Sequence, residues 1–233
     1  MANISADITP RGVSDKYLID LMYMLQQSMY GLCLKLDNDG GVPLTTYVAN
    51  CYTAIFHHCI YDYRGNKTQN VTTVDHIITP IGGLSSAALN SWLFDYVNAF
   101  ETLTEQLDTD VLTDSTYESL GYHACILPYM FENKAGTIIG NDNTSGGFST
   151  TPDDAGTPWR MVKIGPTGKP SDRVLADLFY DILNAWETMA EQLDADGTVT
   201  DVNYEALWYT ATVLMRVENS AGSVLGNAPT RLG

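Results

Sequence analysis

The sequence contains few charged residues, and positive charges are especially scarce. Asp, Glu, Lys and Arg make up 17% of its 233 residues, whereas roughly 25% is usual for soluble domains. Twelve Lys and Arg stand against 28 Asp and Glu, for a formal net charge of −16. Nucleic-acid binding draws much of its affinity from a basic face. We therefore expect no nucleic-acid partner.

Several other signals are missing. No stretch approaches 18 consecutive apolar residues, so we expect no membrane span. The first residues lack the charged and apolar regions of a secretory signal. A nucleophile elbow, a phosphate-binding glycine loop and an H-E-x-x-H run are also missing. We therefore predict a protein that is not an enzyme and needs no cofactor.

The chain has four cysteines, Cys33, Cys51, Cys59 and Cys125, with no C-x-x-C spacing. Three of the four lie in apolar stretches with helical periodicity. Buried thiols in a reducing compartment are the favoured interpretation, and a disulfide pair is the alternative. The composition is also rich in tyrosine, with 14 residues. Tyrosine is enriched at contact surfaces, which favours a protein that works inside an assembly.

The chain repeats itself. The segment LNSWLFDYVNAFETLTEQLDTD (89–110) matches LADLFYDILNAWETMAEQLDAD (175–196) without a gap. A more diverged copy in 18–56 shares the L-D-x-D turn and the tyrosines that follow it. Two further stretches extend the match: 113–124 with 200–211, and 132–141 with 218–227. We therefore predict one domain, 1–233, made of three repeats at 14–63, 86–141 and 171–227, with linkers at 64–85 and 142–170.

Each repeat has the pattern of a helix–turn–helix hairpin. Apolar residues recur in steps of three and four from Leu175 to Leu193, which predicts an amphipathic helix with Ser171 as its N-cap. A second helix is expected after the L-D-x-D turn, with an apolar face that extends to Val217. The predicted fold class is all-α, with three hairpins packed as a helical bundle. The Gly-, Pro- and Thr-rich linkers are expected to be extended and able to form short strands.

The Asp-rich turns offer candidate metal ligands: Asp37, Asp39, Asp108, Asp110, Asp194 and Asp196. The segment from Asp194 resembles part of a calcium loop, in which oxygen ligands alternate before a glycine. A complete loop also needs ligands where Gln192 and Asn203 stand. The favoured alternative is that these acids cap the next helix.

A second cluster contains His57, His58 and Cys59, with Cys51 and Asp62 nearby. On a helix, His58 and Asp62 would share a face and could hold a metal. The paired spacing typical of zinc sites is missing, however. Mostly apolar residues align with these positions in the other copies, which favours core or interface positions.

One segment of the second linker is the best candidate for an arm that binds a partner. It combines apolar and basic residues: Trp159, Arg160, Met161, Val162, Lys163 and Ile164. A long loop of this kind is often functional. The equally favoured alternative is that the run folds onto its own domain as a short strand.

Acidic residues repeat in the first helices of copies two and three but not in copy one. The pairs are Asp95/Asp181, Glu101/Glu187 and Glu105/Glu191, and the first copy holds Met24, Tyr30 and Leu34 instead. The repeated acids predict a solvated face on two copies. The first copy is expected to be covered, either by its sisters or in an assembly.

The phrase LDADGTVTDVNYEAL (193–207), and less closely LDNDGGVPLTTYVAN (36–50), resembles a short helix–turn–helix phrase of small virion proteins of tailed bacteriophages. The second copy lacks the glycine. The resemblance implies a structural virion protein: a capsid decoration or cement protein, or a head–tail neck or tail subunit. Its implied partners are major capsid or neck and tail proteins and further copies of itself.

Two other classes remain open from the sequence. One is a soluble helical-repeat adaptor that binds a protein or peptide. The other is a metal-dependent enzyme built around the Asp turns or the His57, His58 and Cys59 cluster.

Overall fold

The computed structural model describes residues 7–8, 12, 14–38, 47–52, 55, 58–62, 64–68, 76–79, 83–109, 117, 129–132, 138–139, 162–164, 169–195 and 216–225. Most of these lie in four helices, which confirms a mainly helical chain. The helices are α1 (Asp15–Asn38), α2 (Tyr47–Tyr52), α3 (Ser86–Thr109) and α5 (Asp172–Ala195). Among the described residues, no helix is both long and apolar enough to cross a membrane.

A serine precedes each of the three long helices and caps it in the same way. The hydroxyl of Ser14 accepts the backbone N–H of Tyr17 at 3.3 Å. Ser85 accepts the N–H of Ala88 at 3.2 Å, and Ser171 accepts that of Val174 at 3.4 Å. Each hydroxyl satisfies one of the N–H groups that a helix start leaves without a partner. The N-cap predicted at Ser171 is confirmed, and its two counterparts share its role.

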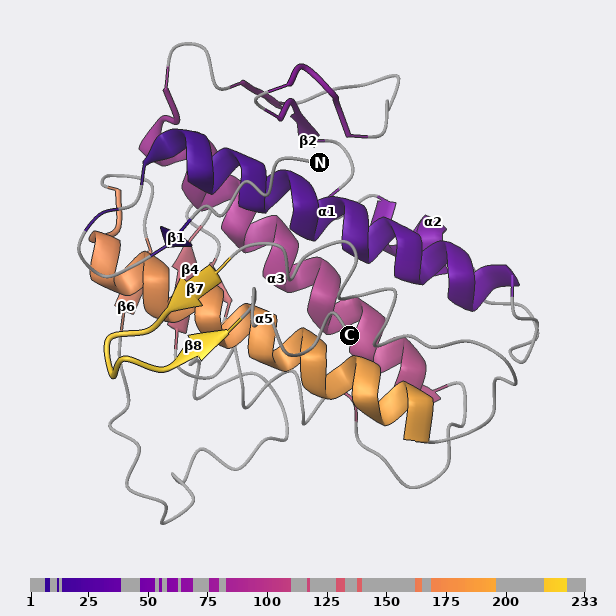
Figure 1. Ribbon diagram of the computed structural model, residues 1–233. Coiled ribbons are helices and arrows are strands. Elements are labelled where there is room, and N and C mark those ends of the chain that lie inside the picture. The colour runs from indigo at the N-terminus through magenta and orange to yellow at the C-terminus, as the bar shows by residue number, and fades with distance from the viewer. Residues whose placement is uncertain are drawn as a thin grey trace.

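The three long helices lie side by side and run in the same direction (Figure 1). At their beginnings, the Asp15 carboxylate contacts both the Leu84 N–H, just before α3, and the Lys169 ammonium, just before α5. Halfway along, the rings of Phe100 and Trp186 lie 4.8 Å apart, and each is the fifteenth residue of its helix. Equivalent residues of two helices therefore meet directly.

The core is formed by the facing sides of these helices and is rich in aromatic residues. Trp92 and Tyr96 of α3 stack with ring centroids 4.8 Å apart, and both are almost completely buried. The Tyr96 hydroxyl reaches α1 and donates to the Leu25 carbonyl at 3.5 Å. Large rigid rings bury much apolar area, so they supply a major part of the stability of this core.

Eight short strands accompany the helices among the described residues. They are β1 (Asp7–Ile8), β2 (His58–Ile60), β3 (His76–Ile78), β4 (Tyr129–Glu132), β5 (Ile138–Ile139), β6 (Val162–Ile164), β7 (Arg216–Glu218) and β8 (Val224–Leu225). They form three small sheets, with orders β1-β7-β8, β2-β3 and β5-β4-β6. β3 and β6 lie in the two linkers, which confirms that these segments form short strands.

Each sheet contains one parallel pair, and these three pairs, which we call the parallel joints, are equivalent. In two of the joints, the strand that precedes a long helix pairs with a strand from the preceding part of the chain: β3 with β2, and β6 with β4. The third joint pairs β1, before α1, with β7 near the other end of the chain. An isoleucine occupies the same place in each joint: Ile78 opposite Ile60, Ile164 opposite Phe131, and Ile8 opposite Val217.

A tight turn of the same construction follows β2 and β7. Asp62 accepts the N–H of Asn66 at 2.7 Å, and Asn219 accepts that of Ser223 at 2.8 Å, each through its side-chain oxygen. The fourth residue of each turn is a glycine with positive φ, 85° at Gly65 and 82° at Gly222. Such turns favour Asp or Asn first and need glycine where φ is positive. The turns that follow β2 in copy one and β7 in copy three therefore have the same construction.

Two predictions about the second helices were wrong where residues are described. Val217 was expected on a helix face but lies in β7, and His58 lies in β2 rather than on a helix with Asp62. Both segments are apolar and short, and at this length periodicity does not separate a strand from a helix. α2 confirms a second helix in copy one. Most of the corresponding segments of copies two and three lie outside the described residues.

The buried Trp186 gives a test of this core. Trp186→Ala should lower the free energy of unfolding by about 3–5 kcal/mol, because it removes a large ring and leaves a cavity. Urea unfolding followed by circular dichroism measures the change. Glu191→Ala, on the exposed face of the same helix, should change it by less than about 0.5 kcal/mol. Equal losses in the two variants would contradict the proposed packing.

Candidate functional site

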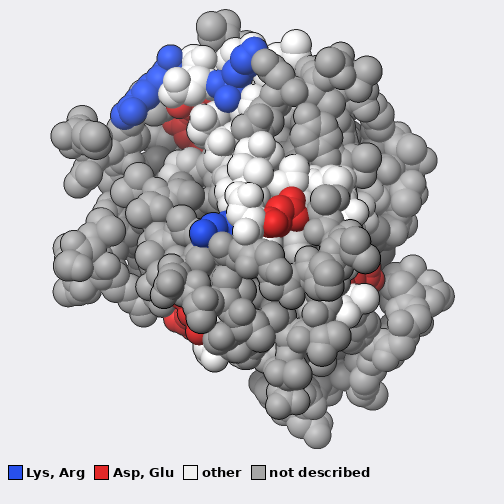
Figure 2. Space-filling model, turned by 90° about the vertical axis from the view of Figure 1, so that its right-hand side faces the viewer, with Lys and Arg blue, Asp and Glu red and all other residues white. Residues whose placement is uncertain are grey.

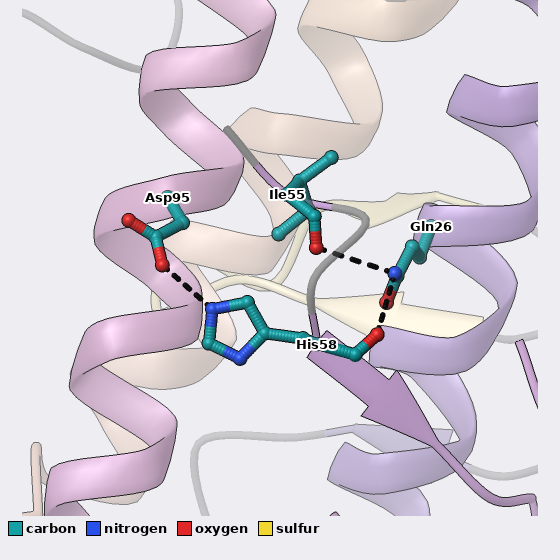
Figure 3. Close-up of polar contacts among 4 residues, drawn as sticks. All are labelled: Gln26, Ile55, His58 and Asp95. Carbon is teal, nitrogen blue, oxygen red and sulfur yellow. Dashed lines mark hydrogen bonds and ion pairs between the residues drawn. The ribbon is translucent and has the colours of Figure 1, made fainter. Parts of the chain in front are cut away.

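The most distinctive polar cluster surrounds His58, where β2 passes between α1 and α3. The His58 side chain is completely buried, and its Nε2–H donates to Oδ2 of Asp95 on α3 at 2.6 Å. On the opposite side, the Gln26 amide of α1 donates to the His58 carbonyl at 2.9 Å and to the Ile55 carbonyl at 3.4 Å. Figure 3 shows Asp95 and Gln26 on either side of the strand. One residue of β2 is thus bonded to both neighbouring helices.

A His–Asp pair is also the geometry by which a carboxylate orients a catalytic imidazole. The His58 ring, however, has no exposed surface through which a substrate could reach it. Cys59 follows His58 in β2, and successive side chains of a strand point to opposite faces, so the Cys59 thiol does not lie beside the His58 ring. What this geometry does is fix β2 against both helices.

The equivalent place between α3 and α5 holds a second pair with the same form. The Tyr129 hydroxyl of β4 donates to Oδ2 of Asp181 on α5 at 2.7 Å. Asp181 stands at the same helix position as Asp95. Both acids were predicted on a solvated face, and the structure shows them half-buried. Each accepts a hydrogen bond from a buried ring of the preceding strand, and α1 has Met24 at this position.

The acids of the Asp turns lie where the cap interpretation places them, as far as they are described. Oδ1 of Asp37 accepts the Tyr47 N–H at 2.6 Å, and Oδ2 accepts that of Val48 at 3.2 Å, at the beginning of α2. Asp108 makes the equivalent 2.6 Å contact with the Tyr117 N–H. Asp194 is half-buried. Asp39, Asp110 and Asp196 lie outside the described residues.

A further polar junction gathers the beginnings of the three long helices. Asp15 accepts the Leu84 N–H at 3.0 Å and pairs with Lys169. Its pKa is lowered by the hydrogen bond from Lys169, then by the one from Leu84, against the opposing effect of burial. Gly83 has a φ of 81°, and a Cβ there would lie 3.3 Å from the Asp15 carboxylate. Glycine therefore lets the chain pass closely beside Asp15.

The cysteines among the described residues are buried thiols, as the favoured interpretation predicts. Cys33 of α1 and Cys51 of α2 have their sulfur atoms 3.7 Å apart. The pKa of Cys33 is raised by the hydrogen bond to Cys51 and by burial. A thiol held protonated in this way is a poor nucleophile and a poor metal ligand. In the part of the chain that the structure describes, no group of three or more His, Cys, Asp and Glu could hold a metal ion.

The candidate partner-binding run is described only at its end. Val162, Lys163 and Ile164 form β6, paired in parallel with Tyr129, Met130 and Phe131 of β4. This end of the run therefore follows the alternative in which it folds onto its own domain. Trp159, Arg160 and Met161 lie outside the described residues, as does His57.

The charged side chains of the described residues do not gather into one patch on the face shown in Figure 2. Among the residues described on that face, two blue groups lie near each other at the upper left with red atoms below them, and a blue and a red group lie close together near the centre. Comparison of the chain with family models, curated proteins and solved structures finds no match.

The His58–Asp95 bond should contribute to stability rather than to chemistry. Asp95→Ala leaves the buried Nε2–H of His58 without its acceptor, so the free energy of unfolding should fall by about 1–3 kcal/mol. Replacing both partners by leucine should cost less, because no polar group is then stranded. Urea unfolding measures all three proteins. A double variant less stable than Asp95→Ala would contradict this account.

The Asp15 junction should give the protein an acid-sensitive contribution. Because the pKa of Asp15 is lowered in the folded chain, its contribution is complete above the unfolded value of about 3.9 and is lost as pH falls below it. Asp15→Asn should therefore be less stable than the natural chain at pH 6, and the gap should narrow toward pH 3. Thermal unfolding over this pH range measures it. A gap that is constant with pH would count against the ion pair with Lys169.

Proposed function

We propose that the chain is a non-enzymatic structural component of a phage virion, most simply a capsid decoration or cement protein or a head–tail neck or tail subunit. It would bind neighbouring virion proteins. The phrase LDADGTVTDVNYEAL (193–207) supports this proposal through its resemblance to virion proteins. The low share of charged residues and the 14 tyrosines support it through composition.

The observation that carries the proposal is the use of the buried polar side chains. In the described residues, His58, Gln26 and Asp95 join elements to one another, as Tyr129 and Asp181 do. Such links make a rigid scaffold and place no reactive group at a surface. This is the arrangement expected of a protein whose role is to hold a shape against its neighbours.

The finer architecture belongs to the same proposal: three repeated helical hairpins packed as one pseudo-symmetric bundle. Four recurring features support it, namely the serine caps, the Asp contacts at the L-D-x-D turns, the parallel joints and the Asp/Asn turns with glycine. The repeat would then include a strand on each side of the hairpin. Packing of like units against one another buries the apolar face that each unit cannot cover alone.

In the proposed bundle, the exposed surface of α1 differs in charge from the exposed surfaces of α3 and α5. Glu105 and Glu191 are exposed on α3 and α5, whereas Leu34 at the equivalent position of α1 is an apolar residue, 38% exposed. The other two long helices, α3 and α5, therefore do not cover this part of α1. A neighbouring virion protein would meet less acidic repulsion and more apolar surface there, so we place a contact with that neighbour on α1.

The first experiment tests the class of protein. The native protein should sediment with virus particles, at a copy number that matches a capsid lattice or a neck or tail ring. An adaptor would instead remain in the soluble fraction and bind its protein or peptide in isolation. Stoichiometric zinc or manganese in the purified chain would favour the metal-dependent enzyme and contradict the proposal.

A pair of variants tests the proposed contact on α1 in the same sedimentation assay. Leu34→Glu should reduce association with particles without unfolding the chain, because glutamate already occupies the equivalent positions of α3 and α5. Val224→Glu is the matched control, since Val224 is exposed to a similar extent, 43%, but lies on β8. Equal association of both variants with particles would remove α1 from the interface.

A further inference from the structure

The third parallel joint differs from the other two in how the chain connects it. Residues 61–75 link β2 to β3, and residues 133–161 link β4 to β6. Each linker limits how far the two strands of its pair can separate. β7 and β1 have no such connection, because residues 9–215 lie between them. Their pairing is nevertheless parallel and in the equivalent register, with Asp7 opposite Arg216 and Ile8 opposite Val217.

The sequence marks β1 as one of three equivalent arms. The strand residue Ile8 is followed by Thr-Pro-Arg-Gly, Ile78 by Thr-Pro-Ile-Gly, and Ile164 by Gly-Pro-Thr-Gly. In each case a long helix begins a few residues later. The first arm thus has the same local chemistry as β3 and β6, but its partner strand β7 follows it in the sequence, beyond residues 9–215.

The described part of the joint between β1 and β7 consists of two register pairs, Asp7 with Arg216 and Ile8 with Val217. Pairing between a short strand and its neighbour can open locally, at less than the cost of global unfolding.

We propose that β1 is an exchangeable arm, which pairs with β7 of a second copy of this chain when copies are concentrated. The exchanged joint reproduces the contacts made within one copy, so little energy separates the two arrangements. Reciprocal exchange gives a closed dimer, and one-way exchange gives a ring or filament. This inference goes beyond the virion role and does not depend on it, since it concerns the purified chain alone.

Two single variants in separate copies provide the test. Asp7→Cys is mixed with Arg216→Cys at rising protein concentration, under oxidised glutathione, and the products are separated on a non-reducing gel. Neighbouring residues of paired strands lie within the distance that a disulfide spans. Exchange predicts a mixed dimer that exceeds both homodimers severalfold and grows with concentration. Mass spectrometry of the joined peptides confirms the position of the cross-link.

The matched control uses a joint that has a short connection. Met130→Cys and Lys163→Cys are opposite each other in β4 and β6, and in separate copies they should give no excess of mixed dimer. The double variant Asp7→Cys/Arg216→Cys, when dilute, should cross-link within one copy and so verify the pairing itself. A mixed dimer of Asp7→Cys and Arg216→Cys no more abundant than this control, or a dilute double variant that fails to cross-link, would overturn the proposal.

Discussion

The structure depends on one constraint: a strand that is buried between two helices must find partners for its polar groups on both sides. β2 meets this constraint through a single residue. The His58 carbonyl accepts a hydrogen bond from Gln26 of α1, and its ring donates to Asp95 of α3. A buried polar group without a partner destabilises the fold more than a completed hydrogen bond stabilises it. These contacts therefore fix where the strand lies. The position of the strand then fixes the spacing of the two helices.

Equivalent positions of the three long helices have different contacts, and these differences help to specify which strand packs on which helix. Asp95 faces a histidine, Asp181 faces a tyrosine, and α1 has Met24 where the other two helices have an acid. In a chain whose parts resemble one another, a strand could pack on the wrong helix. Packing of β2 or β4 against α1 would place a buried donor opposite Met24, which offers no carboxylate to accept its hydrogen bond, so this position disfavours that error.

The long helices and the duplication could be predicted from the sequence, because periodicity over more than twenty residues is a strong signal. The helix that begins near Ser171 and the cap itself are examples. Short strands were expected in the two linkers, where β3 and β6 lie. The other strands, of two to four residues, were not located, since no period can be read in so short a run. Alignment of the first two copies by sequence sets His58 beside Pro128, whereas the structure gives it the place of Tyr129, one residue later. The turn formed by Asp62 and Gly65, repeated at Asn219 and Gly222, could have corrected it. The roles of Asp95 and Asp181 depend on partners far away in sequence, so no local pattern could have shown them.

The shared direction of the three long helices has an electrical consequence. Peptide dipoles add along each helix, leaving partial positive charge at the beginning and negative charge at the end. In antiparallel bundles these fields largely cancel, but here they reinforce one another. The end of the body near Asp15 and Lys169 is therefore less negative than the net charge of −16 suggests. Asp37 and Asp108, near the opposite end, lie against this field and are held by N–H groups at residues 47, 48 and 117. Neighbours that approach along the helix axes would thus meet two ends of unlike potential, and only one of them favours an anionic surface.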